Sequence, residues 1–182
     1  MSISSIICRK NSHLASLETI PRMSLAMERS QKTFSRLGEE EIRDFFLIIL
    51  NSHYEGQALG EAFNISGKTD ILIREDNRNA FIVECKIWSG PKTFLRAIDQ
   101  ILGYSSWRDT KTAILLFNKD SDFTQVLFKI DETVKSHRFY KRKHTLKSSK
   151  LKGETIYSHI FHQPTDRNWE MIISLMAFNI PK

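Results

Sequence analysis

The chain of 182 residues, 41% of them hydrophobic, is long enough for one sizeable core and too short for two comfortable domains. No apolar run approaches the roughly 18 residues that cross a bilayer, and two cysteines are too few for a disulfide framework or a Cys/His zinc site, so we expect a cytoplasmic protein without membrane contact. The net charge of +6 and the pI of about 9.4 favour a polyanionic partner.

The first 36 residues differ in composition from the rest of the chain. They are rich in Ser, poor in acids and only weakly periodic. This pattern predicts an N-terminal arm or linker over residues 1–36, without a fixed fold, followed by a single domain over residues 37–182. The same composition is also typical of an organelle transit peptide, which remains the alternative.

Hydrophobic periodicity predicts the elements of the domain. An apolar stripe and an acidic first turn predict a helix over 38–52. Two more helices are predicted over 92–106 and 123–134, and six strands over 57–64, 68–74, 79–87, 110–117, 154–162 and 169–179. This order predicts an α/β domain with a mixed β-sheet flanked by helices.

Three charged residues interrupt two strands that are otherwise apolar. Asp70 lies in the first strand, Glu84 and Lys86 lie in the second, and the polar residues 76–78 predict a hairpin turn between them. A hairpin centred on Asn77 gives three cross-strand pairs: Asp70 opposite Glu84, Leu72 opposite Ile82, and Arg74 opposite Ala80.

Two directly opposed carboxylates repel each other, because their Cβ atoms lie roughly 4.5–5.5 Å apart on one face of the sheet. A divalent cation removes this repulsion, since Mg²⁺ binds carboxylate oxygens at roughly 2.0–2.1 Å. Lys86 lies two residues after Glu84 and therefore on the same face, where an ammonium group can orient a water or stabilise a phosphate oxygen. The trio is typical of metal-assisted chemistry, and the alternative is an ordinary solvated sheet face.

The same residues resemble a known signature. Asp70, a strand-turn-strand, and the tripeptide Glu84-Cys85-Lys86 inside an apolar strand are similar to the motif of the PD-(D/E)XK, or restriction-endonuclease-like, nuclease superfamily. Thr69 stands where that motif often has proline. The resemblance implies a restriction-endonuclease-like core of the order α-β-β-β-α-β, with the later strands as C-terminal additions.

A second motif lies in the next predicted helix. Gln100 and Tyr104 are one helical turn apart and resemble the Q-x-x-x-Y motif of the RecB-like branch of the superfamily. That likeness implies that both side chains approach the phosphate backbone and the active site. The whole resemblance covers about residues 38–120.

The resemblance implies metal-dependent hydrolysis of phosphodiester bonds in DNA. The carboxylates of Asp70 and Glu84 and the backbone carbonyl of Cys85 would hold Mg²⁺ or Mn²⁺. Lys86 would position the attacking water. Gln100 would orient Lys86 or the scissile phosphate.

Members of the superfamily often add an acid from the first helix to the metal site. Glu39, Glu40 and Glu41 are the candidates here. We expect Glu39 to fill this position, because it continues the apolar stripe of the helix. The alternative for each of the three is a solvated first turn that is stabilised by the helix dipole.

The acid-free basic run from His137 to Lys152 is a candidate surface for nucleic acid, since it contains Phe139, Tyr140 and His144 among seven Lys or Arg residues. It could equally be a solvated loop. With one residue after the second helix, the candidate phosphate contacts are Arg108, Lys141, Arg142, Lys143 and Lys147.

These expectations describe a Mg²⁺-dependent deoxyribonuclease, and defence or repair are roles that the family suggests. The alternative is a non-catalytic module of the same fold that binds nucleic acid without cutting it. Because a short nuclease domain commonly cuts both strands as a dimer or with help, we also expect a homodimer, or a partner protein that targets or activates the enzyme.

Overall fold

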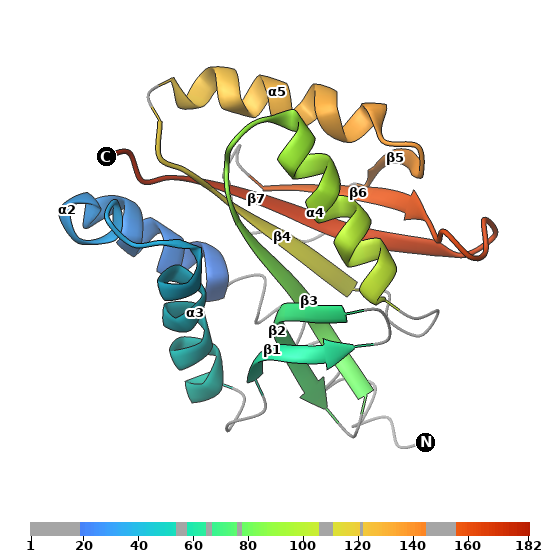
Figure 1. The fold of residues 1–182 in the computed structure, drawn as a ribbon, viewed down its shortest axis with the longest axis horizontal. Coiled ribbons are helices and arrows are strands. Elements are labelled where there is room, and N and C mark those ends of the chain that lie inside the picture. Colours follow the sequence, from blue (N-terminus) through green and yellow to red (C-terminus); the bar gives the residue numbers. More distant parts are fainter. Residues whose placement is uncertain are drawn as a thin grey trace.

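The computed structural model describes residues 19–53, 58–64, 67–75, 78–105, 111–120, 122–144 and 156–182. In this part of the chain a seven-stranded mixed β-sheet is flanked by helices, as the sequence predicts (Figure 1). No helix within these ranges has the length and apolar composition needed to cross a membrane.

The strands of the sheet are β1 (Ala58–Asn64), β2 (Gly67–Glu75), β3 (Arg78–Ile87), β4 (Lys111–Asn118), β5 (Tyr140–His144), β6 (Ile156–His162) and β7 (Glu170–Asn179). Their order across the sheet is β1-β2-β3-β4-β7-β6-β5. The outer pairs are antiparallel, whereas β3, β4 and β7 run parallel to one another. The carboxyl ends of these three central strands therefore meet at one edge of the sheet.

The helices are a segment at residues 19–29, α2 (Gln31–Phe34), α3 (Glu39–His53), α4 (Pro91–Tyr104) and α5 (Phe123–Ser136). The segment at 19–29 and α3 share one apolar cluster with the side of β3 that carries Cys85. Helices α4 and α5 pack on the other side, over Ile114 of β4 and Leu175 of β7, and lie next to each other in Figure 1. Because helices cover both faces, β4 is buried along nearly its whole length and reads as a continuous apolar run.

The expectation that residues 1–36 form an arm is wrong for the part that the structure describes. Residues 19–29 are helical, and their Ile20, Met23 and Met27 are buried in the core. These positions follow the helical spacing i, i+3, i+7, so they form a narrow stripe that docks against the sheet. Residues 1–18 lie outside the described part of the chain.

The basic run contains a strand that the sequence analysis does not predict. β5 pairs antiparallel with β6 and forms one edge of the sheet, and the side chains of Lys141, Arg142 and Lys143 are exposed. Charged residues are common on edge strands because they discourage pairing with a second chain. The remainder of the basic run, residues 145–152, lies outside the described residues.

The predicted hairpin register is correct in the middle of the two strands and wrong next to the turn. Leu72 lies opposite Ile82 as expected, but Arg74 lies opposite Asn79 and not opposite Ala80. The pairing shifts between Ile73 and Arg74, which is the signature of a β-bulge close to the turn. Away from the turn the strands keep the predicted register as far as Ile71 opposite Val83, the pair next to Asp70 and Glu84.

Candidate active site

The side chain of Lys86 lies among three carboxylates that come from three different elements. Its Nζ is 2.9 Å from Oε1 of Glu39 in α3, 3.0 Å from Oε1 of Glu84 in β3, and 3.6 Å from Oδ2 of Asp70 in β2. The Lys86 side chain is only 17% exposed. The structure thus brings together the predicted trio and the predicted acid of the first helix.

Backbone groups of β3 hold two of the carboxylates in place. Oδ2 of Asp70 accepts a hydrogen bond from the N–H of Cys85 at 2.8 Å, and Oε2 of Glu39 accepts one from the N–H of Ile87 at 3.0 Å. Strand alternation turns the Cys85 thiol into the core while Glu84 and Lys86 point to the opposite face. A bond to a fixed N–H limits the rotamers of each acid, so the cluster is rigid at its carboxylates.

Glu39 is the acid that joins the cluster, as the apolar stripe predicts. It is the first residue of α3, and the start of this helix lies beside the end of β3. Glu40 and Glu41 are exposed. The positive end of the helix dipole favours an ionised carboxylate at this position.

Glu84 is the most buried acid of the cluster. The residue is 2% exposed, and its Oε2 accepts no hydrogen bond from any described residue. Burial, together with the neighbouring Asp70 carboxylate, raises the pKa of Glu84 to about 7, although the attraction of Lys86 acts in the opposite direction. A buried carboxylate with one unsatisfied oxygen is costly for an apoprotein and suits a cation ligand.

Lys86 remains charged in this environment. Burial alone would lower the pKa of its ammonium, but Glu84, the hydrogen bond to Glu39, and Asp70 together raise it above the usual value. A single positive charge faces three acidic groups, so the cluster has room for further positive charge.

The donor set fits a hard divalent cation, which prefers carboxylate oxygens. Asp70 and Glu84 would be its ligands, and Glu84 has an oxygen without a partner. In the conformation described, however, no three His, Cys, Asp or Glu residues of the described ranges are arranged as a metal-binding group. The ammonium of Lys86 explains this, because it stands between the carboxylates and holds them to itself.

Helix α4 places the second motif next to the cluster. The hydroxyl of Tyr104 is hydrogen-bonded to the side chain of Gln100, and burial together with the nearby charge of Glu84 raises its pKa. Tyr104 therefore keeps its proton near neutral pH and can donate a hydrogen bond. Gln100 is exposed and bonds to Tyr104, whereas the bonds of Lys86 go to the carboxylates.

The predicted basic contacts on β5 are not close to the cluster. β5 is four places from β3 in the sheet, which corresponds to roughly 19 Å at the usual strand spacing. Lys141 and Arg142 form ion pairs of 2.5 and 2.9 Å with Glu170, and Lys143 lies 5.5 Å from the centre of the Tyr157 ring. Arg108 and Lys147, the other predicted contacts, lie outside the described residues.

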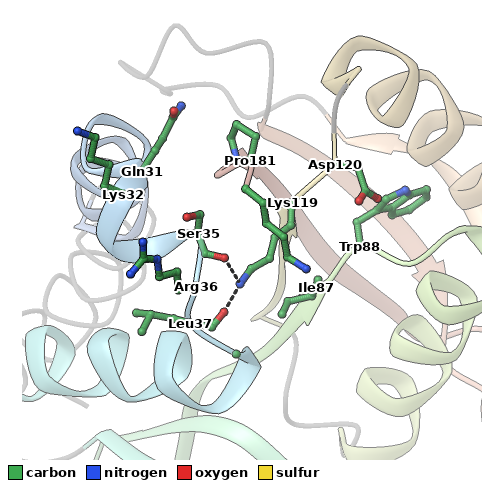
Figure 2. Close-up of a pocket in the computed structure, with 12 residues that line it drawn as sticks. Gln31, Lys32, Ser35, Arg36, Leu37, Ile87, Trp88, Lys119, Asp120 and Pro181 are labelled. Atoms are coloured by element: carbon green, nitrogen blue, oxygen red, sulfur yellow. Dashed lines mark hydrogen bonds between the residues drawn. The ribbon is translucent and has the colours of Figure 1, made fainter.

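Sequence reasoning missed a cavity of about 860 Å³, which is shown in Figure 2. It is lined by Gly38 and Ile87, the chain neighbours of Glu39 and Lys86. Its wall combines the connection between α2 and α3 with the residues that follow β3, β4 and β7. Figure 2 shows the Lys119 side chain reaching back to the carbonyls of Ser35 and Leu37. No local sequence pattern could indicate it, because the lining residues come from separate segments that only the folded sheet brings together.

Comparisons with protein-family models, with curated proteins and with solved structures found no significant match. The functional argument therefore depends on the sequence motif and on the geometry of the cluster around Lys86.

Proposed function

We propose that the protein is a metal-dependent nuclease of the PD-(D/E)XK type that hydrolyses phosphodiester bonds of DNA. The observation that carries this proposal is the position of the Lys86 ammonium within 2.9–3.6 Å of three carboxylates, from Glu39, Asp70 and Glu84. An ordinary solvated sheet face would not bury an acid such as Glu84 beside two others.

The order of elements around the cluster supports the proposal. The acidic α3 precedes β1, β2 and β3, and α4 and β4 follow. This is the order α-β-β-β-α-β that the resemblance implies for the nuclease core. Asp70, Glu84 and Lys86 lie at the positions of the motif, on the adjacent strands β2 and β3.

The chemistry follows from the charges. A Mg²⁺ or Mn²⁺ ion held by Asp70 and Glu84, with the Cys85 carbonyl as a further oxygen donor, would acidify a water and offset the charge of the phosphate. The protonated Lys86 cannot serve as the base, but its ammonium can orient the attacking water or stabilise negative charge on a phosphate oxygen. Glu39 fixes the direction of the Lys86 side chain through its 2.9 Å hydrogen bond.

Helix α4 would complete the site. The protonated hydroxyl of Tyr104 can donate to a phosphate oxygen, and Gln100 orients that hydroxyl. Gln100 would then act on the phosphate through Tyr104 and not by orienting Lys86.

A second function, a nucleic-acid-binding module without catalysis, is favoured by one observation. The ammonium of Lys86 already neutralises part of the charge of its carboxylates without a metal ion. A module of this kind would bind nucleic acid without a divalent cation and would leave it intact.

The test is cleavage of supercoiled plasmid and of linear single-stranded DNA, with Mg²⁺, with Mn²⁺ and with a chelator. We expect metal-dependent nicking or degradation by the wild type, and a loss of at least about 100-fold in Lys86→Ala and in Asp70→Asn. Asp70→Asn is included because it removes a negative charge, whereas Lys86→Ala leaves three acids without their counter-ion and can unfold the protein.

Lys129→Ala is the matched control, since Lys129 is an exposed lysine on α5 that does not contact the cluster. It should cleave like the wild type. Retained DNA binding by a wild type that cleaves with neither metal would contradict the nuclease proposal and support the binding module.

A further inference from the structure

Positive charges outnumber negative ones among the residues that line the cavity. Four of its lining residues are cations: Lys32, Arg36, Lys119 and Lys182. None of the four forms an ion pair with a carboxylate of the described residues, and Lys119 donates instead to the backbone carbonyls of Ser35 and Leu37. On β5, by contrast, Lys141 and Arg142 are paired with Glu170.

The positive charges are also close enough to oppose one another. Burial lowers the pKa of Lys119, and the nearby ammonium of Lys182 lowers it further, although the carboxylate of Glu41 acts in the opposite direction. Asp120 is the one acid among the residues that line the cavity. Cations held together without matching acids are the arrangement that an anionic ligand stabilises.

The position of the cavity links it to the candidate active site. Ile87 ends β3, Lys119 directly follows β4, and Pro181 lies two residues after β7. The carboxyl ends of parallel strands are a common place for ligands in α/β sheets. Ile87 lines the cavity and donates its N–H to Glu39, which in turn accepts from Lys86. The cavity therefore adjoins the cluster at the end of β3.

The cavity also has apolar lining and a volume that suits a nucleotide. Leu37, Ile87 and Pro181 are half-buried and line it together with the cations. A volume of about 860 Å³ is in the range of pockets that hold a nucleotide-sized ligand, and it is too small for a duplex. Apolar side chains beside cations suit the base and the phosphate of one strand.

We propose that this cavity seats nucleotides of a single-stranded nucleic acid, with phosphates on the four cations and a base against the apolar wall. The inference rests on the proposed function, because it makes the cavity the binding site for the strand whose backbone reaches Lys86. It assigns single-stranded nucleic acid as the preferred substrate.

The test measures binding of a fluorescent oligonucleotide by anisotropy in chelator, as a function of salt, for single-stranded and duplex forms. The cavity variant carries Lys32→Gln, Arg36→Gln and Lys182→Gln, three exposed positions outside the core. The control variant removes the same charge from the region of α5, with Lys129→Gln, Lys135→Gln and Arg138→Gln.

We expect the wild type to prefer the single strand. The slope of log affinity against log salt should become about 2 less steep in the cavity variant, because each lost phosphate contact on a single strand contributes roughly 0.7. The control variant should change the slope by much less. Equal losses in both variants, an unchanged cavity variant, or equal affinity for the duplex would overturn the inference.

Two further arms identify the source of the phosphate and separate this inference from the proposed function. If the cavity variant loses binding of free dAMP but not of the oligonucleotide, the cavity takes a free nucleotide and the inference fails. Cleavage with Mg²⁺ is measured in parallel: a wild type that cleaves while the cavity variant binds normally overturns only the inference. A wild type that binds through the cavity without cleaving contradicts only the nuclease proposal.

Discussion

Glu84 links the protonation of the cluster to the stability of the fold. Its folded pKa of about 7 is higher than its usual value of 4.5, because burial and Asp70 disfavour the ionised form. Between these two values the folded protein binds the proton more tightly than the unfolded chain does. Stability contributed by this group is therefore present below pH 4.5 and is lost as the pH rises to about 7.

Glu84→Gln should remove this loss while it keeps the shape of the side chain. In chelator at pH 8, we expect the variant to gain up to about 3 kcal/mol in free energy of unfolding relative to the wild type, because no buried carboxylate must ionise. Urea denaturation at pH 5 and pH 8 measures this, and the two proteins should differ little at pH 5. A variant that is less stable than the wild type at pH 8 would contradict the prediction.

His159 should act in the opposite direction. It is 1% exposed, lies 5.8 Å from the Tyr140 ring between ring centres, and its Nδ1 accepts no bond from a described residue. Burial lowers its pKa from 6.5 to about 4, so the unfolded chain binds the proton first as the pH falls. The contribution of His159 alone should cost up to about 3 kcal/mol of stability between pH 6.5 and pH 4.

In His159→Leu most of the stability that His159 costs at acid pH should be regained. Denaturation midpoints of the variant and the wild type at pH 7, 5.5 and 4 measure this difference. Because the windows of Glu84 and His159 overlap with opposite signs, the wild type alone would show only their difference. Each variant removes one contribution and reveals the other. If His159→Leu loses as much stability as the wild type between pH 6.5 and pH 4, another group is responsible.

Among the elements, the helix at residues 19–29 is the one whose packing in the core the sequence does not predict. Met27 is 2% exposed and shares an apolar cluster with Phe46 of α3 and Phe178 of β7. The N–H of Asn179 also donates to Glu28 of the same helix at 2.6 Å. The helix therefore joins α3 to the central strands and supports the connection that forms one wall of the cavity.

Met27→Ala should destabilise the fold by about 2–5 kcal/mol, because it leaves a cavity in the core. Leu25→Ala on the same helix is the matched control, since Leu25 is 45% exposed and should change stability by no more than about 0.5 kcal/mol. Thermal or urea unfolding compares the two. Equal and small effects would mean that residues 19–29 behave as the arm that the composition indicates.

At the scale of the whole molecule, the net charge of +6 favours a polyanionic partner, but the basic side chains differ in how many of them are already held in ion pairs. The cations that line the cavity form no ion pair with an acid in the described part of the chain, whereas Arg142 and Lys141 of β5 donate to Glu170 and lower its pKa to about 2. The two basic regions lie at different parts of the sheet, so their contributions to binding can be measured separately.

Glu170→Gln should release Lys141 and Arg142 from their ion pairs. If β5 contacts nucleic acid, the salt dependence of oligonucleotide binding should become steeper by up to about 1.4, because two more cations become available at roughly 0.7 each. Anisotropy titrations at several salt concentrations measure this. An unchanged slope would mean that the basic strand is a solvated sheet edge and takes no part in binding.

The sequence by itself determined the order of most elements, the hairpin register near Leu72 and Ile82, and the shared face of Glu84 and Lys86. These features follow from local rules, since the period of two in a strand and the polar turn at 76–78 are readable over a few residues. The choice of Glu39 among three acids was also within reach, because the apolar stripe of α3 indicates which side faces the sheet.

Only the tertiary structure decided the rest. The docking of residues 19–29, the pairing of β5 with β6, and the distances around Lys86 depend on contacts between residues far apart in the chain. The cavity is the extreme case, because its cations become neighbours only when three parallel strands end at one edge of the sheet. No single segment of the sequence indicates which distant residues will become neighbours. Only the folded structure shows where basic side chains gather.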